Sequence, residues 1–165
     1  DLSGVAVQAS LTTTTSNVNG IPTTTAVCSS ATDFAGNSGS ATATFVAPMT
    51  FSGFISPVNG APVVNTGKTG RTYPIKFQLR DAQGAFISAL PAVTSTTYQS
   101  VTCSTFGDAA TDPLPTDTSG SSGLRYDTTT NQFSYTWKTP GTAGCYVFRL
   151  GLADGTTYSA NFKLQ

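Results

Sequence analysis

The sequence predicts an all-β protein built of β-sandwiches, and three observations carry this prediction. Within 71–81 (RTYPIKFQLRD) polar residues alternate with Tyr73, Ile75, Phe77 and Leu79, as in a strand with one buried and one wet face. Threonine, a strand former, is abundant, whereas glutamate, a strong helix former, is absent. Two-residue turn motifs such as Asp154-Gly155 separate short apolar runs.

Residues 1–47 are expected to form about three short strands of an incomplete sandwich. Turn chemistry that tolerates positive φ lies between them, at Asn19-Gly20 and in 33–37 (DFAGN). Large apolar residues are too few here to bury both faces of a sheet, and so small a segment rarely folds alone. The alternating apolar strand positions are Val5, Val7 and Ala9, then Ala26 and Cys28, then Ala41, Ala43 and Phe45.

The motifs of this first segment resemble the second half of bacterial surface immunoglobulin-like repeats. The matching positions are Ser3-Gly4-Val5, Gly20, Cys28, Ala31-Thr32-Asp33, Ala35-Gly36-Asn37 and 41–45 (ATATF). Those repeats begin further upstream, with strands that this sequence does not contain. In many of them the equivalent of Cys28 pairs with a cysteine just upstream of the Ser-Gly-Val motif, where this sequence has none. Cys28 is therefore expected either as a buried thiol or in a bond to another chain.

Residues 48–165 are expected to form a complete β-sandwich. Pro48 ends the first segment. Because proline has no backbone N–H, Pro74 either limits the strand of 71–81 to a sheet edge or lies at its start. We expect a central, aromatic-rich strand that is entered beside this proline. An apolar piece at 85–90 and an exposed loop at 107–123 connect the later strands. Those strands are expected at 98–106, in a hairpin of 124–126 with 131–139, and in a hairpin of 145–152 with 156–164.

This second segment resembles the PxKF-type domain found at the C-termini of secreted bacterial multidomain proteins. The naming motif is 74–77 (PIKF), supported by 51–58 (FSGFISPV), 124–139 (LRYDTTTNQFSYTWKT), 141–150 (GTAGCYVFRL) and 152–164 (LADGTTYSANFKL). The resemblance covers about 49–165 and implies an immunoglobulin-like β-sandwich without a catalytic role. It also implies a disulfide between Cys103 and Cys145, the alternative being two buried thiols. Such a bond indicates an oxidising, extracellular setting.

Composition excludes several classes of function. The eight basic and eight acidic residues give a formal net charge of +0, so the basic footprint of a nucleic-acid binder is missing. No apolar run reaches the roughly 20 residues needed to span a bilayer. Without histidine a Ser–His–Asp triad is impossible. A Ser–Lys pair is formally open to Lys68, Lys76, Lys138 and Lys163, but nothing in the sequence desolvates them, and we expect no enzyme.

The sequence also contains candidate ligands for a metal ion and for a sugar. Asp33 with Asn37, or Asp108, Asp112 and Asp117, offer oxygen ligands for calcium, yet neither set has the acid density or glycine spacing of a calcium loop. Turn formation explains these residues better, so no metal and no cofactor is expected. Aromatic residues could present a carbohydrate-binding platform, although the alternation of Phe133, Tyr135 and Trp137 favours a sandwich core. The platform candidates are Trp137, Tyr135, Tyr98, Tyr126, Tyr146 and Tyr158.

The incomplete first segment suggests assembly with copies of the same chain. A half-sandwich leaves open sheet edges and an uncovered apolar face, and such edges are templates for pairing with another chain. Strand addition from a neighbouring copy would propagate head to tail into a filament, as in donor-strand assembly of pili. The residues expected to take part are Val5, Val7, Ala26, Cys28, Ala41, Ala43 and Phe45. The competing interpretations are a passive stalk or adhesin fragment of a larger surface protein, and a carbohydrate-binding module.

Overall fold

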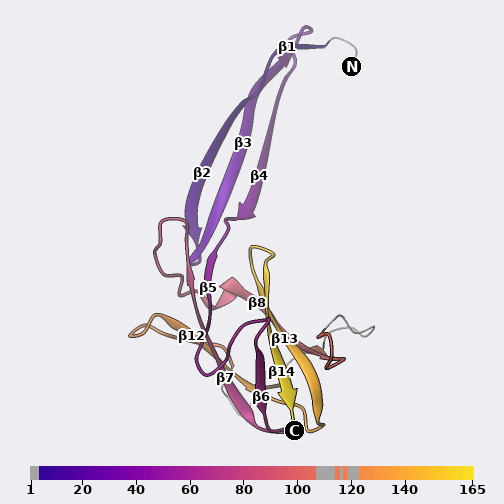
Figure 1. Ribbon diagram of the computed structural model, residues 1–165. Helices are drawn as coiled ribbons and strands as arrows, with labels where there is room; N and C mark the ends of the chain where they lie inside the picture. Colours follow the sequence, from indigo (N-terminus) through magenta and orange to yellow (C-terminus); the bar gives the residue numbers. More distant parts are fainter. Residues whose placement is uncertain (1–3, 107–113, 116, 119–122) are drawn as a thin grey trace. The chain divides into compact units, whose positions relative to one another are not determined.

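The computed structural model describes residues 4–106, 114–115, 117–118 and 123–165, and the chain is all-β, as the sequence predicts (Figure 1). The chain divides into two compact units, Asp1–Pro48 and Met49–Gln165. The division lies one residue beyond the boundary expected from the sequence. In the described ranges the single helical element is the short 3₁₀ helix η1, Leu90–Ala92. No helix in these ranges is long and apolar enough to cross a membrane.

The first unit is one layer of antiparallel strands (Figure 1). The central strand β3 (Ile21–Asp33) pairs along one edge with β1 (Val5–Val7) and β2 (Ser10–Val18). Its other edge pairs with β4 (Ser38–Val46). No second sheet covers either face of this layer within the unit as described. Pro22 and Ala47 are accordingly its only buried residues in the described range.

Two expectations for this unit need correction. The strands are not all short, because β2 spans 9 residues and β3 spans 13. Strand β2 was not expected at all, since its sequence SLTTTTSNV lacks an alternation of apolar and polar residues. The turn at Asn19-Gly20 is confirmed: both residues have positive φ, 52° and 80°, as a two-residue hairpin loop requires.

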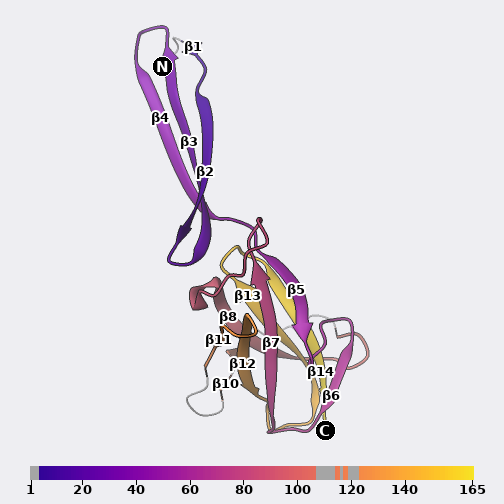
Figure 2. The ribbon, with the colours of Figure 1, turned by 90° about the vertical axis from the view of Figure 1, so that its left-hand side faces the viewer.

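The second unit is a sandwich of two sheets that face each other (Figure 2). The first sheet contains β10 (Asp117–Thr118) and β11 (Arg125–Asp127), which both pair with β12 (Gln132–Lys138), then β7 (Thr72–Arg80) and β5 (Thr50–Ile55). The second contains β6 (Val64–Gly67), β14 (Thr157–Leu164), β13 (Gly144–Leu152), β8 (Val93–Val101) and β9 (Leu114–Pro115). This distribution of consecutive strands between two sheets is that of an immunoglobulin-like sandwich.

The aromatic core of this sandwich forms where the alternation predicts it. Ile75, Phe77 and Leu79 on β7 are each 0% exposed. Trp137 on β12 is also fully buried, with its ring 4.8 Å from that of Phe162 and 5.3 Å from that of Phe148. Side chains from both sheets therefore interlock around Trp137.

Pro74 lies inside β7 rather than at its start, and β7 has neighbours on both sides. Strand β5, however, pairs with β7 only from Lys76 to Arg80, so β7 has no strand on that side at Pro74. Thr139 donates its N–H to the carbonyl of Arg71 (2.8 Å), and this sets which residues of β7 turn their backbone groups toward β12. Pro74 turns its nitrogen to the vacant side, where no donor is needed.

Three further expectations are shifted or untested. The strand expected at 98–106 is β8 at Val93–Val101, and turns follow it. The apolar piece at 85–90 contains no strand: Phe86 forms an isolated bridge with Arg80, and Leu90 begins η1. The exposed loop expected at 107–123 lies largely outside the described residues. The two hairpins of the C-terminal half are confirmed as β11–β12 and β13–β14.

Candidate functional site

The candidate site is one face of the single-layer sheet, and strand register determines which residues share it. Leu11 pairs with Cys28 and Cys28 with Ala41, so these three side chains lie in one row. The next row is Thr13–Ala26–Ala43 and the third is Thr15–Thr24–Phe45. We call this surface the open face; its apolar members are Leu11, Pro22, Ala26, Cys28, Ala41, Ala43 and Phe45.

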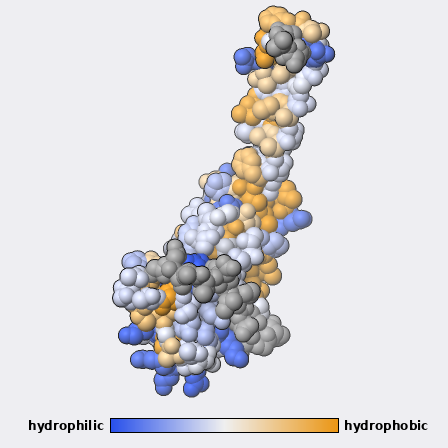
Figure 3. Space-filling model, turned by 90° about the vertical axis from the view of Figure 1, so that its right-hand side faces the viewer, coloured by the Kyte–Doolittle hydropathy of each residue, from blue (hydrophilic) through white to orange (hydrophobic). Residues whose placement is uncertain are grey.

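The open face leaves large apolar side chains in contact with water. Leu11 is 65% exposed and Phe45 is 51% exposed. Apolar side chains form patches along the surface of this unit (Figure 3). The opposite face contains mainly hydroxyl side chains, among them Thr14, Thr25 and Thr44 in one row, together with Val18, Ile21, Val27 and Val46. A layer with one apolar and one hydroxyl-rich face has the pattern of half a sandwich.

Within the part of the chain that the structure describes, both outer strands of this layer present unpaired backbone groups. The Ala47 N–H donates to the Pro22 carbonyl at 2.8 Å, and the antiparallel pattern then turns the backbone groups of Thr42, Thr44 and Val46 away from β3. By the same alternation Thr13 and Thr15 point outward from β2. Neither β2 nor β4 contains a charged residue or a proline, the usual devices that block edge pairing.

The structure brings together five of the seven residues predicted for assembly. Ala26, Cys28, Ala41, Ala43 and Phe45 all lie on the open face. Val5 and Val7 on β1 are exposed, but a register shift separates them, and the register does not assign them to this face. Leu11 and Pro22 were missed. The four consecutive threonines at 12–15 have high strand propensity and could have revealed β2, and with it Leu11.

The three cysteines have different environments. Cys103 and Cys145 form the disulfide that the resemblance implies, with their Cα atoms 5.1 Å apart. It joins the turn after β8 to β13. Cys28 is a free thiol. It is half-buried in a hollow of about 280 Å³ between the C-terminal part of β3 and the N-terminal part of β4. Small residues line this hollow, including Ala31, Gly39 and Ala41.

The residues considered for metal binding form turns where the structure describes them. The Asp33 carboxylate accepts hydrogen bonds from the Asn37 backbone N–H (2.8 Å) and side-chain amide (2.7 Å). This closes the turn between β3 and β4. Asp108 and Asp112 lie outside the described residues, as does the side chain of Asp117. Across the described ranges no three Asp or Cys residues gather in a way that could hold a metal ion.

The lysines considered for a Ser–Lys pair are not enclosed. Lys68, Lys138 and Lys163 are exposed, and Lys76 is half-buried on β7. A nucleophilic pair requires a lysine that burial keeps neutral, and none of these four is buried.

The aromatic residues considered for sugar binding point mostly into the core. Trp137 is 0% exposed, Tyr135 4% and Tyr146 6%, so these rings have no free face to offer a sugar. Tyr98, Tyr126 and Tyr158 are half-buried. Tyr158 stacks on Phe51 at 4.0 Å between ring centroids. None of the six candidates therefore forms an exposed platform.

Comparison with known proteins gives no further assignment, since the sequence matches no protein-family model and no curated protein. The candidate site is therefore defined by its geometry alone. It is an apolar sheet face bounded by two strands with free hydrogen-bonding groups.

Proposed function

We propose that the chain is an extracellular, non-enzymatic structural protein whose copies join by β-strand complementation into a surface filament. The observation that carries this proposal is the open face of the first unit. A single layer of strands with an apolar side exposed on this scale lacks the buried area that keeps a small domain folded. Covering this face with β-structure from another copy supplies that area.

The edges and the charge pattern support the same proposal. Strands β2 and β4 are long, uncharged and free of proline, so their outward N–H and C=O groups are available to another strand. With a formal net charge of +0, copies of the chain do not repel one another strongly. The disulfide between Cys103 and Cys145 fits an oxidising, extracellular location.

The two units of the chain differ from each other, and this difference determines the type of assembly. A contact between the first unit of one copy and a different surface of the next is heterologous, and such contacts form open filaments unless the rotation closes a ring. The resemblance to surface immunoglobulin-like repeats and to the PxKF-type domain agrees with a role at the cell surface. In a passive stalk, the main competing function, further strands of the same polypeptide would cover the open face.

The first test compares two lysine substitutions at neighbouring positions of β3. Ala26→Lys places a charge on the open face, whereas Val27→Lys places it on the hydroxyl-rich face of the same strand. We expect the wild-type chain to sediment as concentration-dependent oligomers and to form fibres in negative-stain electron microscopy. Ala26→Lys should abolish both, because burying an unpaired charge is costly, while Val27→Lys should preserve them.

A wild-type chain that stays monomeric at all concentrations would contradict the filament. The open face would then belong to a stalk. Equal effects of the two lysine variants would also contradict the role of this face.

A further inference from the structure

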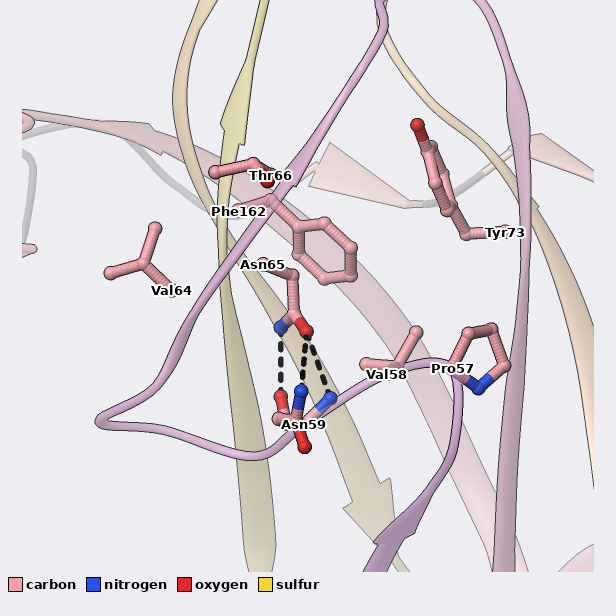
Figure 4. A pocket seen from close by; sticks show the side chains of 8 residues that line it. All are labelled: Pro57, Val58, Asn59, Val64, Asn65, Thr66, Tyr73 and Phe162. Carbon is pink, nitrogen blue, oxygen red and sulfur yellow. Dashed lines mark hydrogen bonds between the residues drawn. The ribbon is translucent and has the colours of Figure 1, made fainter.

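The second unit has a cleft of about 340 Å³ beside its edge strand β6 (Figure 4). Its apolar walls come from both sheets and the connection between them: Phe162 on β14, Tyr73 on β7, and Pro57 and Val58 after β5. The volume lies in the range of sites that hold a bulky side chain or a small ligand.

The polar side chain of Asn65, which lines this cleft, forms its hydrogen bonds with neighbouring residues of the same unit. Its amide donates to the carbonyls of Asn59 (2.8 Å) and Asn161 (3.0 Å), and its Oδ1 accepts the Asn59 backbone N–H (2.9 Å). These bonds fix the loop that precedes β6 (Figure 4). Val58 and Phe162 are themselves fully buried, so the apolar surface that the cleft leaves open comes mainly from Pro57 and Tyr73.

Strand β6 borders the cleft and has a free edge. Among the described residues it pairs only with β14, in parallel, and Gln165 donates its N–H to the Gly67 carbonyl at 3.0 Å. In a parallel pair alternate residues bond to the partner, so Asn65 and Gly67 face β14. Val64 and Thr66 turn their N–H and C=O groups outward, and Val64 is 39% exposed.

Strand β7, which borders the cleft through Tyr73, is a less favourable site for an incoming strand. Strand β7 has no neighbour on the β5 side before Lys76, and there Pro74 presents a nitrogen without hydrogen. Proline at such a position is a common protection against edge pairing. Strand β6 has neither proline nor charge, so strand addition is favoured at β6.

We propose that β4 of a second copy adds antiparallel to β6, with the Phe45 side chain entering the cleft. The inference rests on the proposed function and specifies the junction. The outward groups of Thr44 and Val46 on β4 meet those of Thr66 and Val64 on β6. In this register Phe45 stands opposite Asn65, on the same side of the sheet as Phe162.

Strand β4 fits this edge better than β2, the other free edge of the first unit. On its open face β4 carries Ala41, Ala43 and Phe45, whereas β2 carries Leu11, Thr13, Thr15 and Asn17. The single large side chain of β4, Phe45, therefore corresponds to the single cleft beside β6. After addition, the open face lies on the same side as the inner face of the neighbour's sheet, and the junction itself covers its Phe45 end.

The test is a disulfide trap in the full chain. Hydrogen-bonded antiparallel partners have Cα atoms about 5.5 Å apart, a distance that a disulfide spans. Mixing the variants Thr44→Cys and Thr66→Cys under mild oxidation should give a covalent dimer that reduction removes, with the link mapped to residues 44 and 66 by peptide mass spectrometry. The matched control mixes Thr13→Cys, at an outward position of β2, with Thr66→Cys and should give no such link.

The outcomes separate the junction from the filament. A link between 44 and 66 supports the proposal. Fibres without this link, or with a link between 13 and 66, overturn the junction and leave strand complementation standing at another surface. A chain that forms no oligomers overturns both.

Discussion

At the scale of single residues, the aspartates act as turn formers. Asp81 accepts the N–H groups of Gln83 and Ala85, and Asp127 accepts the N–H of Thr129 and the hydroxyl of Thr130. The hydrogen bonds from Thr130 and Thr129 hold the pKa of Asp127 below its ordinary value. Aspartate suits this role because its short carboxylate side chain mimics a backbone turn.

Asp154 also links distant parts of the second unit. Its carboxylate accepts the N–H of Met49 (2.8 Å) and both the N–H and the hydroxyl of Thr156. Burial alone would raise the pKa of Asp154, but the hydrogen bonds from Thr156 and Met49 outweigh it, so its pKa lies below the ordinary value of 3.8. The carboxylate anchors the first residue of the unit to the β13–β14 turn.

Asp154→Asn should therefore make the stability of the second unit less dependent on pH. Because the folded-state pKa is lowered, the contribution of Asp154 is present above the unfolded-state pKa and is lost as the pH falls through the folded-state value. We expect the variant to lose about 1 kcal/mol at neutral pH, a modest figure for a partly exposed site. The difference from wild type should vanish in acid.

Urea unfolding at a series of pH values measures this difference. Thr156→Val, which removes one donor and keeps the Met49 contact, should lose less at neutral pH. A difference between wild type and Asp154→Asn that stays constant into acid would contradict the assigned role.

At the scale of elements, the disulfide ties the turn after β8 to β13. Cys103 and Cys145 are 42 residues apart in sequence, and closing a loop of that length stabilises by about 4 kcal/mol in the chain-entropy model. The double variant Cys103→Ala/Cys145→Ala should lose a stability of this order, measured by chemical denaturation. A reducing agent should destabilise wild type similarly and leave the double variant unchanged. An unaltered midpoint in the variant would contradict this.

The strands differ in how well the sequence predicts them, for a physical reason. Strand β7 was predicted because one of its faces is buried, which forces apolar and polar residues to alternate. Strand β2 has both faces exposed, so no such alternation exists and only threonine propensity marks it. The open face could not be assigned in full, because its rows depend on the register between β2, β3 and β4.

At the scale of the whole molecule, the two units are stabilised by different interactions. The second has an aromatic core and a disulfide, whereas the first depends on its ladder of hydrogen bonds. In the dilute monomer we expect amide hydrogen exchange to be fast in β3 and slow in β13.

Assembly should slow exchange in β3 and β4 while leaving β13 unchanged, because the added contacts lie on the first unit and at the edge of the second. Hydrogen-exchange mass spectrometry at low and high protein concentration measures this shift. If β3 is as protected as β13 in the monomer, the first unit folds without a partner and the need for complementation disappears.

The parallel pairing of β6 with β14 has a mechanical consequence. Consider a tensile load that pulls β6 at its N-terminal end and β14 at its C-terminal end. Because these strands run in the same direction, the two forces would slide them past each other and strain all their hydrogen bonds at once. An antiparallel pair loaded at adjacent ends would instead unzip one bond at a time. Under a load applied in this way, the edge of the second unit would resist stretching.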